Sequence, residues 1–163
     1  MHYVSTRNPE IRLSAAQAIV QGLSRDGGLF LPEEIPQITL EEIAALSKLP
    51  YPERAAKIMK RYLEEFTEEE LRGFAEKAYG AKKFDDPKAA PVKDLGDGRY
   101  IMELWHGPTC AFKDMALQML PYLLTASLKK TGEDKTVCIL VATSGDTGKA
   151  ALEGLRDVEH TKI

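Results

Sequence analysis

The sequence predicts an α/β protein with a helical N-terminal domain, residues 1–85, followed by the first part of a parallel-sheet α/β domain, residues 86–163. Three observations support this prediction. Helix-start patterns recur in the first half. The segment 81–91 is rich in charge, proline and alanine, which is typical of a linker. After it, apolar runs alternate with helical patterns, as in a parallel sheet with crossover helices.

Residues 1–80 are predicted to be helices separated by turns. Three helix starts carry a capping box, in which a Ser or Thr side chain and a Glu or Gln side chain three residues later each bind the other's backbone N–H. The three pairs are Ser14 with Gln17, Thr39 with Glu42 and Thr67 with Glu70. Gly22 and Gly80 mark expected helix ends. Another helix is expected to begin near Pro52 and to bury an apolar stripe. The stripe consists of Ala56, Met59, Leu63 and Phe66.

The second half has the pattern of a sheet with covering helices. Two β-like runs surround residues 96–98 and predict a hairpin. Residues 114–130 form an apolar helical pattern that is expected to break or kink near Pro121. Residues 136–142 are continuously apolar, which favours a strand buried on both faces, and a helix is expected over 148–158. Because the last residues of the sequence predict the start of another strand, we expect the sequence to be a fragment of a longer protein.

Composition and charge narrow the classes of function. Hydrophobic residues make up 44% and charged residues 29% of the sequence, which is typical of a soluble globular protein. The net charge of −3 gives no reason to expect nucleic acid or an anionic membrane as a partner. Neither a signal peptide nor a membrane span is predicted, so we expect a cytoplasmic protein. Cys110 and Cys138 lack metal-site spacing and are expected to be buried free thiols.

The loop "ATSGDTGKA" (142–150) follows the apolar run and resembles a nucleotide-binding loop. A Walker A loop would need glycine at Thr143 and a hydroxyl at Ala150, and a dinucleotide loop would need a third glycine, so both are rejected. The position after a strand and before a helix still suits an anion. The alternative is purely structural, with Ser144 or Asp146 capping the helix; the loop alone does not decide between them.

The segment "HGPTCAFKDMALQ" (106–118) contains a candidate nucleophile. Lys113 has apolar neighbours and precedes Asp114, which is expected to cap the next helix. Burial and a helix N-terminus both disfavour the ammonium form, and a neutral amine can attack an aldehyde cofactor. The alternative is a surface lysine, or one paired with Asp114. His106 is either an acid–base group or a turn-stabilising residue, and Trp105 is expected in the core.

Two segments in combination resemble the threonine synthase family: "HGPTCAFKD" (106–114) and "ATSGDTGKAAL" (142–152). "YVSTR" and "AIVQGLSRDGGLFLPEEIP" are similar to the start of that family, so the resemblance covers the whole chain. It implies a pyridoxal-phosphate enzyme with the tryptophan-synthase-β-like fold, also called PLP fold type II.

The resemblance also implies roles for individual residues. Lys113 matches the lysine that binds the cofactor covalently and later moves protons. The loop that receives the substrate's carboxylate matches Ser144, Gly145, Asp146 and Thr147, and Asp146 also lies beside the cofactor's ring oxygen. Phe112, as a cofactor contact, and Thr109, as a substrate contact, are expected to shape the pocket. No metal is expected.

The reaction implied by the resemblance converts O-phospho-L-homoserine and water to L-threonine and phosphate, by γ-elimination and β-hydration. Lys113 would be the base. A lyase acting on another phosphorylated amino acid, and a non-catalytic remnant of the fold, remain alternatives. The family's phosphate-binding loop and the partner of the pyridine nitrogen would lie beyond Ile163. We therefore expect the 163-residue chain alone to be inactive; its oligomeric state is not predicted.

Overall fold

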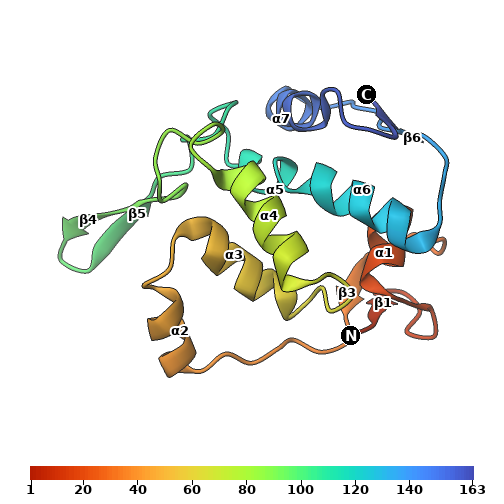
Figure 1. Cartoon of the computed structure of the whole chain (residues 1–163), viewed down its shortest axis with the longest axis horizontal. Coiled ribbons are helices and arrows are strands. Elements are labelled where there is room, and N and C mark those ends of the chain that lie inside the picture. The colour runs from red at the N-terminus through yellow and green to blue at the C-terminus, as the bar shows by residue number, and fades with distance from the viewer.

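The computed structural model describes all residues from Met1 to Ile163 and contains seven helices and seven short strands. The helices are α1 Ala15–Gln21, α2 Leu40–Leu46, α3 Tyr51–Lys60, α4 Glu68–Tyr79, α5 Asp114–Leu117, α6 Leu120–Thr131 and α7 Asp146–Leu155. The strands are β1 Tyr3–Ser5, β2 Arg12–Leu13, β3 Phe30–Pro32, β4 Val92–Gly96, β5 Arg99–Met102, β6 Val137–Cys138 and β7 Thr161–Lys162. Figure 1 shows α3 and α4 in the middle, α5 and α6 beside them and α7 at the opposite edge from α2.

All three predicted capping boxes are confirmed at the starts of α1, α2 and α4, with both reciprocal hydrogen bonds present in each. Helix α1 ends at Gly22, which adopts a φ of 73°. Helix α4 ends before Gly80, where a Cβ atom would lie 2.4 Å from the carbonyl oxygen of Glu76. The local backbone chemistry therefore sets these helix boundaries, as the sequence predicted.

The prediction that residues 1–80 contain only helices and turns is wrong at the N-terminus. Strand β1 lies between β2 and β3 in a three-stranded antiparallel sheet, with Val4 opposite Arg12 on one side and Leu31 on the other. Each strand is only two or three residues long. Such short strands show too little alternation for periodicity to detect them.

The largest apolar core joins α3 and α4 to the start of α6. Its buried members are Ala15, Ala56, Leu63, Phe66, Leu71, Ala75, Ala78, Tyr79, Phe84, Ala89 and Met119. Leu63 and Phe66 belong to the predicted stripe but follow the end of α3 at Lys60, so α3 is shorter than expected. The Tyr79 hydroxyl donates to the carbonyl oxygen of Met115 at 2.7 Å, which ties α4 to α5. This core contains residues from both sides of the predicted domain boundary, which stays a prediction.

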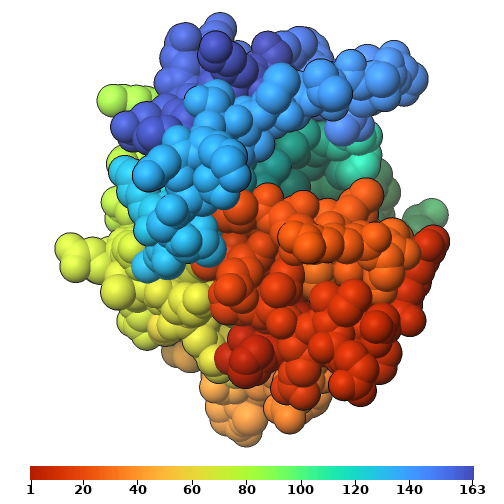
Figure 2. All heavy atoms as spheres, turned by 90° about the vertical axis from the view of Figure 1, so that its right-hand side faces the viewer, coloured from red at the N-terminus to blue at the C-terminus, as the bar shows by residue number.

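Helix α6 connects the N-terminal region to the last helix. Leu124 and Leu128 of α6 pack with Leu155 of α7, while Ile19 and Val20 of α1 approach the same cluster. Figure 2 shows the red and orange N-terminal residues directly against the light-blue surface of α6. The predicted break in the helix 114–130 is confirmed, because α5 ends at Leu117 and α6 begins at Leu120. Pro121 lies in the first turn of α6, where its missing N–H leaves no bond unmade.

The predicted hairpin and the predicted parallel strand pair are both confirmed. Strands β4 and β5 are antiparallel and project away from the helices, whereas β6 and β7 are parallel and connected through α7. The expectation of a strand over 136–142 buried on both faces is wrong: β6 covers two residues and Leu140 is 92% exposed. The reason is that only Val137 and Ile139 of this run pack against a core cluster, so its other face is left uncovered. No helix is long and apolar enough to cross a membrane.

Candidate active site

Lys113, the predicted nucleophile, lies immediately before α5 and is half-buried. Its Nζ atom lies 4.2 Å from the centroid of the Phe112 ring, in a cation–π arrangement on an exposed aromatic side chain. The amine takes part in none of the ion pairs of the chain. The alternative in which Lys113 pairs with Asp114 is therefore wrong, and the contact of Nζ with the Phe112 ring takes its place.

Asp114 is not the helix cap that the sequence predicted. It is the first residue of α5 and only 1% exposed, and both of its carboxylate oxygens accept hydrogen bonds from Thr109. Oδ2 accepts from the Thr109 backbone N–H at 2.8 Å and Oδ1 from the Thr109 hydroxyl at 2.7 Å. The carboxylate thus caps the preceding loop instead of its own helix, because Thr109 supplies two donors in a buried place.

The backbone at Gly107 packs directly against this carboxylate. A Cβ atom on Gly107 would lie 2.6 Å from both Cβ and Oδ2 of Asp114, closer than real Cβ contacts. Cys110 has a φ of 58° and its N–H donates to the carbonyl oxygen of Gly107 at 3.1 Å. The motif before α5 is therefore a tight turn whose shape depends on a residue without a side chain.

The loop before α7 is held by Thr143. Its hydroxyl oxygen accepts from the backbone N–H groups of Gly145 at 3.2 Å and Gly148 at 3.0 Å. Neither Ser144 nor Asp146 makes a capping hydrogen bond, so the structural alternative for these two residues is wrong. In the sequence, Thr143 stands where a Walker A loop would need glycine, and no capping role was assigned to it; the signal missed was a Thr placed before a helix start.

The four residues expected to receive a substrate carboxylate remain exposed. They are Ser144, Gly145, Asp146 and Thr147. Gly145 has a φ of 142°, a region that residues with a Cβ rarely adopt. Lys149 lies in the first turn of α7, as the sequence predicted. The loop therefore presents hydroxyl and backbone groups to solvent, where a ligand can reach them.

The two motifs meet through the packing of α5 against α7. A Cβ atom on Gly154 of α7 would lie 2.1 Å from the carbonyl oxygen of Leu117, so the two backbones touch at this glycine. A glycine inside a helical pattern was the available signal for this contact, and it was overlooked. The helices that follow the two predicted motifs are thus fixed to each other directly.

His106, the first residue of the lysine motif, contacts Glu103 and Asp85 through its two ring nitrogens. Its Nε2 atom lies 3.0 Å from Oε2 of Glu103 and its Nδ1 atom 2.6 Å from Oδ1 of Asp85. The hydrogen bond to Glu103, followed by that to Asp85, raises the pKa of His106 above its ordinary value. This geometry supports the turn-stabilising interpretation of His106, because both ring nitrogens are engaged.

Other side chains of the second half lie at the surface, contrary to expectation. Cys110 and Cys138 are exposed free thiols, and Trp105 is 51% exposed. Cys110 sits at the tip of the tight turn, and Cys138 lies in a two-stranded sheet with an open edge. Apolar neighbours in sequence did not indicate burial of the thiol, because Val137 and Ile139 are half-buried against a core cluster while Cys138 between them is exposed. No group of three or more metal-ligating side chains is present.

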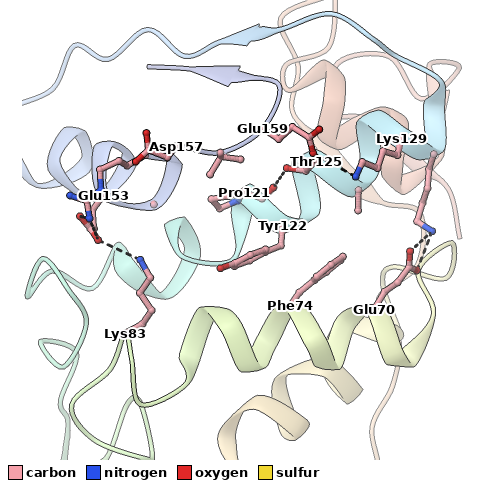
Figure 3. A pocket seen from close by; sticks show the side chains of 15 residues that line it. Glu70, Phe74, Lys83, Pro121, Tyr122, Thr125, Lys129, Glu153, Asp157 and Glu159 are labelled. Atoms are coloured by element: carbon pink, nitrogen blue, oxygen red, sulfur yellow. Dashed lines mark hydrogen bonds and ion pairs between the residues drawn. The ribbon is translucent and has the colours of Figure 1, made fainter.

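The largest pocket lies away from both motifs. It has a volume of about 780 Å³ and is bounded by α4, α6 and the residues after α7, with none of the expected site residues in its lining. Figure 3 shows the rings of Phe74 and Tyr122 beside it and the ion pair between Lys83 and Glu153. Its three lysines and Arg156 are each paired with a carboxylate, so Asp157 is the charged lining residue that makes no ion pair. A second cavity, of about 650 Å³, includes Thr109 and Lys149.

Comparison with known proteins agrees with the two motifs. The family "Threonine synthase N terminus" matches residues 2–79. The threonine synthase of Pseudomonas aeruginosa is 42% identical over the whole chain, and threonine synthase-like 2 of Xenopus laevis is 36% identical. The crystal structure of PLP-bound threonine synthase from Brucella melitensis superimposes with a TM-score of 0.91 and 38% identity over 100% of this chain. The chain covers 34% of the length of each of these three proteins, about a third.

Proposed function

The chain belongs to the threonine synthase family, and on this premise we propose that its residues serve a pyridoxal-phosphate enzyme that makes L-threonine. The observation that carries the proposal is the burial of the Lys113 amine and its lack of an ion pair. The amine is half-buried and free of any ion pair, and it precedes a helix packed against α7, which follows the exposed polar loop 144–147.

The residues present fit this cofactor. Pyridoxal phosphate needs an amine that can attack its aldehyde, and Lys113 is such an amine without a competing carboxylate. Its ring also needs an apolar or aromatic surface, and Phe112 exposes one beside the amine. When bound, the cofactor supplies an electron sink that accepts the electrons released at the substrate's Cα.

Each expected site residue has a proposed part. Lys113 Nζ binds the cofactor and then moves the protons at Cα and Cβ of the substrate. The loop before α7 binds the substrate carboxylate through Ser144, Gly145, Asp146 and Thr147, with Asp146 also beside the cofactor's ring oxygen. Their exposure supports this assignment, because no hydrogen bond within the helix cap occupies their side chains. Phe112 lines the cofactor side of the pocket.

The proposed reaction is O-phospho-L-homoserine plus water to L-threonine plus phosphate. Protons leave Cα and Cβ, the γ-carbon–oxygen bond breaks and phosphate leaves. A proton then adds at Cγ to form the methyl group, and water adds its hydroxyl at Cβ while Cα regains a proton. Proton transfers at carbon need a base close to both carbons, and a lysine freed from the cofactor is such a base. A small-molecule substrate also agrees with the net charge of −3, which favours no polyanionic partner.

The test labels the cofactor lysine directly. The full-length natural protein carrying these residues is mixed with pyridoxal phosphate and reduced with borohydride, and the pyridoxyl group is located by peptide mapping. We expect it on the peptide that contains Lys113, and expect Lys113→Ala to abolish it. Lys149→Ala is the matched control, because Lys149 is an exposed lysine in the first turn of α7. A label elsewhere, or no label, would falsify the assignment.

A lyase that releases phosphate without making threonine is the second candidate. The observation in its favour is that relatives named threonine synthase-like 2 match the whole chain at 34–36% identity. Measuring phosphate and threonine in the same reaction separates the two: equal amounts support the synthase, and phosphate without threonine supports the lyase. If neither forms in a protein that binds the cofactor, the chain belongs to a non-catalytic member. A cytoplasmic location stays a prediction, to be checked by cell fractionation.

A further inference from the structure

The loop that carries Lys113 is closed on itself by one buried carboxylate. Thr109 donates to both oxygens of Asp114, through its backbone N–H and through its hydroxyl, at 2.8 and 2.7 Å. No cation pairs with Asp114, so these two bonds are the partners that compensate for its burial. We call Thr109 and Asp114 together the clasp.

The backbone of Gly107 also restricts the clasp, because it limits the conformations open to the Asp114 side chain. The backbone of Gly107 approaches Asp114 so closely that a Cβ atom there would lie 2.6 Å from Oδ2. The carboxylate is thus held between Thr109 on one side and Gly107 on the other. A side chain confined in this way keeps one rotamer, so the backbone of Asp114 is fixed with it.

We propose that the clasp is a positioning device for the amine of Lys113. Lys113 directly precedes Asp114, and the Cα atoms of the two residues are separated by one peptide unit, about 3.8 Å. Fixing the backbone of Asp114 therefore also restricts the position of the Cα atom of Lys113. The backbone bond from the N–H of Leu117 to the carbonyl oxygen of Lys113, at 2.9 Å, fixes it from the helix side. The inference rests on the proposed function in one respect only, the choice of Lys113 as the cofactor amine.

This assignment changes the part expected of Thr109. The residue is 8% exposed and gives its hydroxyl proton to Asp114, so it has no proton left to donate to a substrate. Thr109 and Asp114 are accordingly positioning residues, which act on the reaction through Lys113. A positioning role predicts that the hydroxyl matters and the methyl group does not, so Ser should replace Thr109 and Val should not.

The first experiment measures the reactivity of Lys113 without any cofactor. The full-length natural protein is treated with a trace amount of an amine-acylating reagent, and acylation of Lys113 is expressed relative to exposed Lys149 in the same molecule. In Thr109→Val we expect this ratio to rise about fivefold, because losing one hydrogen bond releases the half-buried amine into solvent. Thr109→Ser should restore the original ratio. An unchanged ratio in Thr109→Val would overturn the positioning role.

A matched control removes a hydroxyl that makes a hydrogen bond of the same length elsewhere. Thr125 of α6 is half-buried and donates to the carbonyl oxygen of Pro121 at 2.7 Å. Thr125→Val should leave the acylation ratio unchanged. If it raises the ratio as much as Thr109→Val does, the effect is general loosening and the proposal is wrong.

The second experiment adds pyridoxal phosphate and traps it with borohydride. The same Thr109→Val variant should show about fivefold less label on Lys113 per mole of protein, since a mobile amine no longer meets the bound aldehyde in one orientation. Acylation and trapping at Lys113 thus move in opposite directions, and because general loosening would produce the same pair of changes, the Thr125→Val control separates the two causes. If the unsubstituted protein traps no cofactor on Lys113, the proposed function fails, and the acylation ratios still decide for or against the clasp.

Discussion

The loop before α5 and the loop before α7 both carry residues of the candidate site, yet they are held in opposite ways. In the first, a buried carboxylate binds two donors of one residue and lies against a glycine backbone. In the second, one hydroxyl accepts two backbone N–H groups, and the residues from Ser144 to Thr147 stay exposed. The first loop is closed by its own side chains and the second is open to ligands.

This difference suits the two kinds of work that the site requires. A reactive amine must be kept at one place, because small displacements reduce the rate of attack strongly. Groups that bind a substrate carboxylate must instead remain unpaired until the substrate arrives. The contact between Gly154 and Leu117 joins the two loops through their helices. Each prediction below perturbs one side of this comparison, in order of decreasing effect on the free energy of unfolding.

The largest effect is expected where the two helices touch. In Gly154→Ala the new methyl group would lie 2.1 Å from the carbonyl oxygen of Leu117, so α5 and α7 must separate. We expect a loss of about 3 kcal/mol in the free energy of unfolding, measured by denaturant titration. The matched control is Gly73→Ala in α4, where a Cβ atom would meet nothing within 4 Å. That variant should gain roughly 0.5–1 kcal/mol; a similar loss in both would contradict the role of the contact.

The next prediction compares the two loops directly. Asp114→Ala leaves the N–H and the hydroxyl of Thr109 without partners in a buried place, and we expect a loss of about 2 kcal/mol. Thr143→Val releases the N–H groups of exposed Gly145 and buried Gly148, and should lose about 1 kcal/mol. Thermal or denaturant unfolding of both variants gives the comparison. A larger loss in Thr143→Val would reverse our description of which loop is closed.

How far the sequence predicted this arrangement depends on the range of each interaction. Capping boxes were found because both partners lie within one turn of a helix, as for Thr67 and Glu70. The parallel pairing of β6 and β7 was found because the apolar run and the helix α7 follow each other along the chain. By contrast, the three-stranded sheet depends on pairing between β1 and β3, whose residues are far apart in sequence.

In the candidate site, too, a contact between residues separated along the chain escaped prediction, although the separation is shorter. The motif around Lys113 was found by its residues, but Asp114 was assigned to its own helix, because a capping residue normally serves the helix that follows it. Its actual partner, Thr109, lies five residues earlier and became visible only with the turn at Gly107. Burial was misjudged for Trp105 and Cys138, because exposure depends on which surfaces other elements cover.

A smaller effect is expected from the histidine that links residue 85 to the loop before α5. Glu103 and Asp85, with Asp86 nearby, raise the pKa of His106 in the folded chain above the unfolded value of about 6.5. Its charged form therefore stabilises the fold fully below pH about 6.5, and this contribution is lost as the pH rises through the folded pKa. His106→Gln should remove that part of the pH dependence. An NMR titration that finds a pKa for His106 at or below the ordinary value would contradict the geometry.

The smallest effect on stability, together with a distinct effect on binding, is expected at the open loop. Ser144 is exposed and makes no capping bond, so Ser144→Ala should change the free energy of unfolding by less than about 0.5 kcal/mol. If Ser144 donates to the substrate carboxylate, the same variant should raise KM about tenfold, since a hydrogen bond to a charged group is at stake. Ser47→Ala, which removes a hydroxyl that donates to the carbonyl oxygen of Ala44 at the end of α2, is the control that should leave KM unchanged. A destabilised Ser144→Ala with unchanged KM would mean that this loop, like the one before α5, is closed by its own side chains.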